Sequence, residues 1–177
     1  MDSARGQLLI AGPALRDSNF WRTVVLVVEH TDEGALGLVL NRPSETRIAE
    51  AVPDLEELLD RDDRLFIGGP VQPAAAIVLA EFEHATDAAL LAFDDIGVLA
   101  TQGPISGLRR GRAFVGHAGW GPGQLDEELQ RDDWILEAAS ERDAFSADPR
   151  ELWAAVLTRK GGSYALLARM PSDPSVN

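Results

Sequence analysis

Short apolar runs separated by turn residues dominate the first half of the chain. The run Thr23–Glu29 is β-branched and almost continuously apolar, which predicts a strand buried on both faces. Turn residues at Thr31–Gly34 precede a second apolar run, Ala35–Asn41, so the pair predicts a β-hairpin that stops at Asn41-Arg42-Pro43. Further strands are predicted at Leu8–Ala11, Leu65–Ile67, Ala75–Phe82, Ile96–Leu99, Ala113–Ala118 and Trp134–Ala138.

Apolar residues at helical spacing predict three helices. The first covers Ile48–Leu59, where Pro53 should break or restart it. The second covers Pro122–Arg131, with a proline near its first turn and acidic residues after it. The segment Tyr164–Arg169 fits a strand and a helix equally well.

The third predicted helix, Pro149–Lys160, has the clearest signals. Asp148 is a candidate cap, and Glu151 stands at the capping-box spacing. A glycine pair then ends the helix. Its buried stripe is predicted to consist of Leu152, Trp153, Val156 and Leu157.

The order of these elements predicts an α+β fold. The predicted strands begin with a hairpin and mix irregularly with helices, so a strict β-α-β alternation is absent. We therefore expect a large mixed, mainly antiparallel β-sheet with helices packed on it. Residues 1–169 should form a single domain, because 177 residues is an ordinary length for one domain. The Pro/Ser-rich segment 170–177 is predicted to be a flexible tail.

Composition narrows the class of protein. Apolar residues make up 45% of the chain and charged residues 25%, as in ordinary globular proteins. The chain has no cysteine, which rules out disulfides and thiolate metal sites. The first residues do not resemble a secretory signal, and no apolar run has the length of a membrane span. We therefore expect a cytoplasmic protein without membrane contact.

The net charge of −13 bears on the choice of partner. Proteins that bind nucleic acids draw most of their non-specific affinity from cations that neutralise phosphates. The only basic cluster in this sequence is Arg109, Arg110 and Arg112. Direct nucleic-acid binding is therefore disfavoured.

Two segments are candidates for a binding site. The glycine-rich block Gly116–Gln124 precedes a predicted helix, where main-chain N–H groups can bind an anion. However, it lacks the lysine of a P-loop, and the simpler interpretation is a tight strand-to-helix turn pinned by Trp120. Arg42 could clamp a carboxylate or phosphate, although structural pairing with an acidic residue is favoured. Candidate ligand-binding residues are Asn41, Arg42, His117, Trp120 and Gln124.

No catalytic residue or metal site emerges from the sequence. The three histidines, His30, His84 and His117, lack the spacing of paired metal ligands, so no metal and no cofactor are expected. No G-x-S-x-G motif marks a nucleophilic serine. If a site exists, we expect it where Asn41–Pro43, Gly68–Pro70 and Gly116–Gln124 converge.

Five blocks stand out by their order and spacing: Gly6–Ala11, Phe20–His30, Gly34–Pro43, Gly68–Val71 and Gly116–Leu125. Together they resemble the AlgH/YqgE family of bacterial proteins, and the resemblance extends from Gly6 to about Leu157. Thr23 and His117 depart from the family pattern, where serine and an aromatic residue are expected. The resemblance implies an α+β fold with a large mixed sheet but no catalytic residues, and some members are described as transcriptional regulators.

Three functions are compatible with these observations. The favoured one is a non-enzymatic regulatory or interaction domain that acts through a protein partner or a small ligand. The second is an enzyme with a site near the Gly116–Gln124 loop. The third is a DNA-binding transcriptional regulator, which the charge disfavours. The sequence leaves the oligomeric state open.

Overall fold

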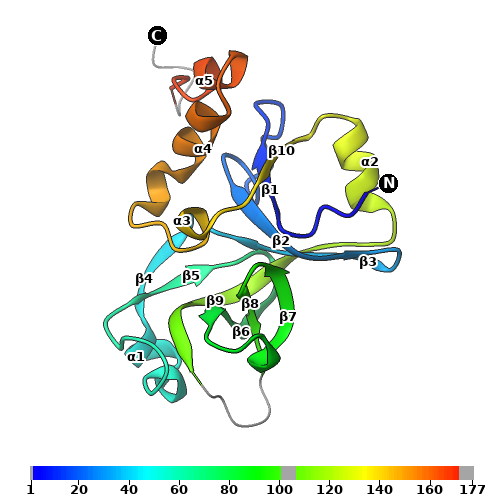
Figure 1. Ribbon diagram of the computed structural model, residues 1–177. Helices are drawn as coiled ribbons and strands as arrows, with labels where there is room; N and C mark the ends of the chain where they lie inside the picture. Colours follow the sequence, from blue (N-terminus) through cyan, green and yellow to red (C-terminus); the bar gives the residue numbers. More distant parts are fainter. Residues whose placement is uncertain (1, 101–106, 172–177) are drawn as a thin grey trace.

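One curved sheet organises the protein, in a computed structural model that describes residues 2–100 and 107–171 (Figure 1). Its main path runs β10-β1-β2-β3-β9-β6-β8-β7, and β4 pairs with β5 beside it. Strand pairs are antiparallel, except that β5 runs parallel to β9. The α+β class with a mixed, mainly antiparallel sheet is thereby confirmed. The strands are β1 Gln7–Ala11, β2 Val24–Thr31, β3 Gly34–Val39, β4 Pro43–Arg47, β5 Arg64–Ile67, β6 Val71–Phe82, β7 Ala88–Phe93, β8 Ile96–Leu99, β9 Leu108–Trp120 and β10 Trp134–Ala138.

Helices and short 3-10 turns lie around this sheet. Figure 1 shows α4 and α5 on one side of β1 and β2, with α2 on the other side. No helix within the described residues is long and apolar enough to cross a membrane. The α-helices are α1 Ile48–Ala51, α2 Gln124–Gln130, α3 Glu141–Ala144, α4 Leu152–Lys160 and α5 Ser163–Leu167, and the 3-10 turns are η1 Pro53–Leu55, η2 Ala85–Asp87 and η3 Pro149–Glu151.

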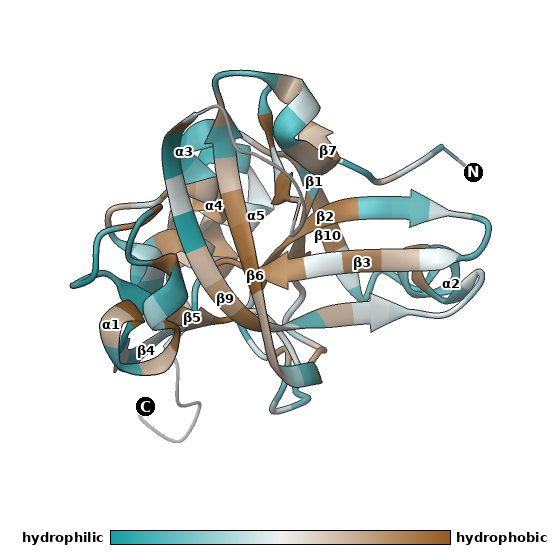
Figure 2. Ribbon diagram, turned by 90° about the horizontal axis from the view of Figure 1, so that it is seen from below, coloured by the Kyte–Doolittle hydropathy of each residue, from teal (hydrophilic) through white to brown (hydrophobic). Residues whose placement is uncertain are grey.

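Strand β2 is buried on both faces, as its continuous apolar run predicts. Successive side chains of a strand point to opposite faces of the sheet. Leu26 and Val28 thus join the core beneath α4, whereas Val25 and Val27 join the core beneath α2. In Figure 2 the first part of β2 and the last part of β3 are coloured as apolar, in keeping with this double burial.

Helix α4 closes the larger core. Its predicted stripe of Leu152, Trp153, Val156 and Leu157 is buried. The predicted start is wrong, however, because Asp148 makes no capping hydrogen bond with its side chain. Pro149–Glu151 forms a separate 3-10 turn there, and the α-helix begins only at Leu152.

Two further predictions about elements are confirmed, and three elements were missed. Pro53 divides the first predicted helix into α1 and η1, and the hairpin of β2 and β3 is present. The ambiguous segment near Tyr164 is helical, as α5. The sequence interpretation omitted β4, β7 and α3.

Candidate functional site

Asn41 holds two neighbouring segments together. Its side-chain N–H donates to the Arg22 carbonyl at 2.8 Å, and its side-chain oxygen accepts from the Val24 N–H at 2.9 Å. These bonds replace sheet pairing where β3 has ended and the chain before β2 is still irregular. Asn41 therefore fixes the conformation of the β1–β2 loop, and both polar ends of its side chain have protein partners.

Arg42 supports the same loop. Its guanidinium donates to the carbonyls of Ser18 at 3.1 Å and Trp21 at 3.5 Å, and also to the Asn19 carbonyl. Burial lowers the pKa of Arg42, while nearby Asp17 acts in the opposite direction. The sequence interpretation favoured pairing with an acidic residue, but the direct partners are main-chain carbonyls.

The three segments expected to converge do so only in part. The Gly68 carbonyl accepts from the Val39 N–H, and the Gly68 N–H donates to the Val115 carbonyl, both at 2.9 Å. A side chain on Gly68 would collide with the Gly116 carbonyl, so glycine is needed for this close main-chain packing. The segment next to Pro70 thus meets β3 and the middle of β9. Trp120 lies farther along β9, paired with Ala35.

His117 lies in that close-packed part of β9, paired with Val71. Its Nδ1 atom is buried and has no hydrogen-bond partner among the described residues. Burial lowers the pKa of His117, because the imidazolium form loses hydration. Neutral imidazole is therefore favoured at this position.

Trp120 and Gln124 are brought together by a residue that the sequence interpretation did not single out. Glu128 accepts hydrogen bonds from the indole N–H groups of Trp120 and Trp134, each at 2.8 Å. It also accepts from the Gln124 amide at 2.9 Å, and Gln124 in turn accepts from the Gly121 N–H at 3.0 Å. The tight strand-to-helix turn before α2 is therefore pinned as predicted.

A histidine–carboxylate contact does occur, next to α2. Nδ1 of His30 accepts from the Ala4 N–H at 3.0 Å, while Nε2 lies 3.7 Å from a carboxylate oxygen of Asp126. That separation exceeds hydrogen-bond distance, and the contact ties the N-terminal segment to α2. No group of three or more potential metal ligands occurs within the described residues.

Two of the three arginines in the basic cluster on β9, Arg109 and Arg110, are neutralised by carboxylates. Arg109 pairs with Glu81 and Asp95, at 3.8 and 3.7 Å. Arg110 pairs with Glu81 at 2.7 Å and with Glu141 at 3.0 Å. These pairings leave little positive potential for a phosphate backbone, which counts against a nucleic-acid interface here.

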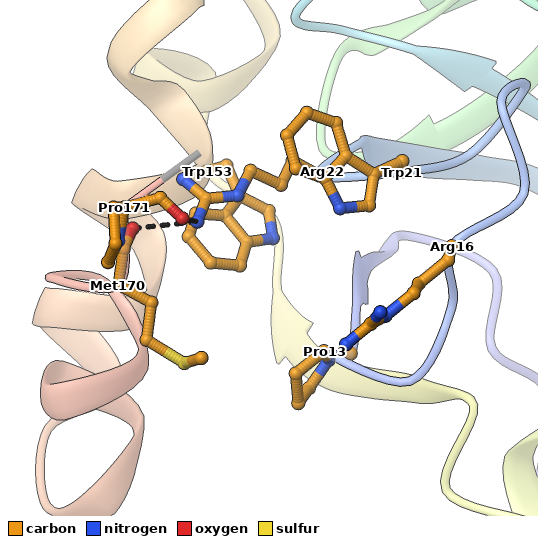
Figure 3. A pocket seen from close by; sticks show the side chains of 8 residues that line it. Pro13, Arg16, Trp21, Arg22, Trp153, Met170 and Pro171 are labelled. Atoms are coloured by element: carbon orange, nitrogen blue, oxygen red, sulfur yellow. Dashed lines mark hydrogen bonds between the residues drawn. The ribbon is translucent and has the colours of Figure 1, made fainter. Parts of the chain in front are cut away.

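A cleft missed by the sequence interpretation lies between the β1–β2 loop and α4 (Figure 3). It encloses about 380 Å³. In the close-up, Arg22 and Trp153 lie at one end, with Pro13 and Arg16 facing Met170. The lining consists of Gly12, Pro13, Arg16, Trp21, Arg22, Trp153, Met170 and Pro171. Aromatic and apolar surface is thus combined with two guanidinium groups.

Arg22 is the central residue of this cleft. Its guanidinium carbon lies 4.5 Å from the Trp153 ring centroid and 5.2 Å from that of Trp21. Its Nη2 atom donates to two successive carbonyls, Met170 at 2.7 Å and Pro171 at 2.8 Å. The φ angle of Arg22 is +52°, in a region that residues other than glycine rarely adopt. Such strain is often found at ligand-binding positions.

The supporting network connects the predicted residues to the cleft. Asn41 binds the Arg22 carbonyl, and Arg42 binds the Trp21 carbonyl. Trp153 is also fixed, because its indole N–H donates to the Ala11 carbonyl at 3.1 Å. Both predicted residues thus position cleft residues, and their own side chains do not line it. In the sequence, the cleft is indicated only by Trp21-Arg22, an aromatic residue followed by a cationic one just before a buried strand.

Comparison with known proteins agrees with this architecture. The model of a family described as AlgH-like (DUF179) matches residues 8–165. A UPF0301 protein of Thermobifida fusca is 39% identical over 190 residues, covering 99% of this chain and 96% of the relative. A UPF0301 protein of Streptomyces coelicolor is 37% identical over 187 residues, covering 100% and 97%.

Two solved structures have the same fold. The crystal structure of a Corynebacterium diphtheriae protein superposes with a TM-score of 0.83 at 23% identity, covering 96% of this chain and 93% of that one. The solution structure of the AlgH protein from Pseudomonas aeruginosa gives a TM-score of 0.73 at 30% identity, covering 97% and 96%. The family match and the near full-length relatives lead to one conclusion: this chain belongs to the AlgH-like family.

Proposed function

We propose that this protein is a non-enzymatic interaction domain that binds an extended, acidic segment of a protein partner in the cleft of Trp21, Arg22 and Trp153. One observation carries the proposal: a single nitrogen of Arg22 binds two successive main-chain carbonyls, those of Met170 and Pro171. Extended peptides present such carbonyls whatever their side chains. The cleft therefore holds a peptide-like segment from its own chain.

Charge supports an acidic partner. Arg16 lines the cleft and has no ion pair with any residue of the described ranges. A protein of net charge −13 repels most acidic peptides at long range. An arginine without an ion-pair partner is therefore a position at which an acidic peptide can bind. Trp21 is 40% exposed and offers an apolar contact surface beside it. Aromatic residues and arginines are the types that contribute most to binding energy at interfaces.

The chain's own segment gives the site a built-in competitor. A partner must displace the Met170 and Pro171 carbonyls before Arg22 can bind its main chain. Because of this competition, the apparent affinity for the partner is the intrinsic affinity multiplied by the fraction of molecules whose cleft is free. In this proposal the protein regulates its partner by binding alone, and no chemical step is involved.

A fluorescein-labelled peptide with the sequence of residues 168–177 is a suitable probe, because it carries the carbonyl pair, an aspartate and a terminal carboxylate. We expect saturable binding to the full chain by fluorescence anisotropy. Arg22→Gln should weaken it about tenfold or more, since charge-assisted hydrogen bonds are lost. Arg64→Gln, remote from the cleft, is the matched control. Equal affinity of the Arg22 variant and the parent protein would refute the proposal.

A further inference from the structure

A second cavity lies beside β5 and shares no lining residue with the cleft of Arg22. It encloses about 230 Å³, which is below the size of a typical drug-sized pocket and suits a ligand of amino-acid size. Strands β4, β5 and β9 and the segment after α3 all contribute to its wall. The lining consists of Pro43, Asp63, Arg64, Phe66, Gly111, Arg112, Ser146, Ala147 and Pro149.

Arg112 is held rigidly in this wall. Its guanidinium carbon lies 4.5 Å from the Phe66 ring centroid, and its Nη2 donates to the Ser146 carbonyl at 3.0 Å. Its Nη1 atom is buried and has no hydrogen-bond partner among the described residues. An arginine has five N–H donors, so most of the capacity of Arg112 is left unused. A half-buried cation with spare donors is suited to a carboxylate.

Asp63 supplies the opposite charge at the rim. Its carboxylate makes no hydrogen bond or ion pair within the part of the chain that the structure describes. Burial raises the pKa of Asp63 and lowers that of Arg112, and the charge of each group opposes the shift of the other. The two side chains do not form a salt bridge. Two opposite charges that line one cavity without forming a salt bridge leave room for a ligand that carries both charges.

The other charged side chains at this cavity already have ion-pair partners. Arg64 pairs with Glu45 at 3.3 Å, and Arg150 pairs with the second carboxylate oxygen of Glu45 at 3.3 Å. Asp62, next to Asp63, pairs with Arg47 at 3.5 Å. Arg112 and Asp63 are therefore the two lining groups whose charges lack a direct partner among the described residues.

We propose that this cavity binds a small zwitterion, with a free α-amino acid as the simplest case. The carboxylate of the ligand binds Arg112, and its ammonium group binds Asp63. Pro43, Phe66 and Pro149 provide apolar contact for the side chain. The site is independent of the peptide cleft, and either proposal can fail while the other stands.

Thermal unfolding of the full chain with each common free amino acid, at low millimolar concentration, tests this proposal. We expect at least one amino acid to raise the melting temperature, because a ligand that binds only the folded state stabilises it. Calorimetric titration with the best amino acid is then compared with its decarboxylated and its deaminated analogue. Each analogue should bind about tenfold more weakly or worse, since each lacks one charged contact.

Substitutions of the two charged lining residues test whether the amino acid binds in this cavity. Arg112→Gln and Asp63→Asn should each abolish the shift or reduce the affinity about tenfold. Arg109→Gln, on the same strand but outside the cavity, should leave it unchanged. Asp63 is exposed, so its variant remains informative if the Arg112 variant does not fold. The proposal is overturned if no amino acid raises the melting temperature, if one analogue binds as tightly as the amino acid, or if the Asp63 variant responds like the parent.

Discussion

At the scale of single residues, polar side chains near the β1–β2 loop satisfy main-chain groups. The sequence indicated that Asn41 and Arg42 matter, because they end a buried strand. It could not indicate their partners, since Arg22, Trp21 and the loop residues are about twenty positions away. Nor could it reveal Glu128, whose three donors come together only when α2 folds against β9 and β10.

Asn41→Ala tests the role of this residue. The change leaves the Arg22 carbonyl and the Val24 N–H without their partner, which should lower the free energy of unfolding by about 1–3 kcal/mol. Urea denaturation provides the measurement. Asn19→Ala is the matched control and should change stability by less than about 0.5 kcal/mol, because the Asn19 side chain is exposed. Equal effects of the two changes would contradict the assignment.

His117 should make stability depend on pH. Its pKa in the folded protein is lowered by burial, so the unfolded chain binds its proton more readily. The stability that depends on neutral His117 is therefore fully present above the unfolded pKa of about 6.5, and it is lost as pH falls from there through the lower pKa of the folded protein. His117→Asn should reduce this loss in urea titrations near neutral and mildly acidic pH. Asn19→Ala, an exposed change that removes no titratable group, should reproduce the parent's pH dependence.

At the scale of elements, apolar periodicity predicted most strands and the buried stripe of α4. The missed strand β7, Ala-Ala-Leu-Leu-Ala-Phe, has residues that favour helices. Its strand conformation comes from pairing with β8, which local propensity does not encode. Strand β4 was missed because it begins with Pro43, although proline is tolerated at the first position of a strand.

The junction of β9 and α2 depends on Glu128. Glu128→Ala leaves two buried indole N–H groups unpaired, which should cost about 2–4 kcal/mol of unfolding free energy. Near-ultraviolet circular dichroism should change as well, because Trp120 and Trp134 lose their common anchor. Glu127→Ala, on the exposed side of the same helix, is the comparison and should be close to neutral. A neutral Glu128 variant would show that aromatic packing alone holds this junction.

At the scale of the whole molecule, net charge and the distribution of ion pairs support protein or small-ligand binding over DNA binding. The arginines on β9 are largely paired with carboxylates, whereas Arg16 at the cleft is not. The cleft itself is built from segments far apart in the chain, the β1–β2 loop, α4 and Met170–Pro171. The sequence does not show that these segments are neighbours in the folded protein. The fold could therefore be predicted from the sequence, whereas the cleft could not.

The chain's four tryptophans allow the central claim to be measured directly. Trp21 and Trp153 line the cleft, while Glu128 holds Trp120 and Trp134. The ¹H–¹⁵N spectrum of the four indole N–H groups, recorded as the peptide of residues 168–177 is added, separates the two pairs. We expect the Trp21 and Trp153 signals to shift in a saturable way and the Trp120 and Trp134 signals to stay in place. Saturable shifts confined to Trp120 and Trp134, or no shift at all, would contradict it.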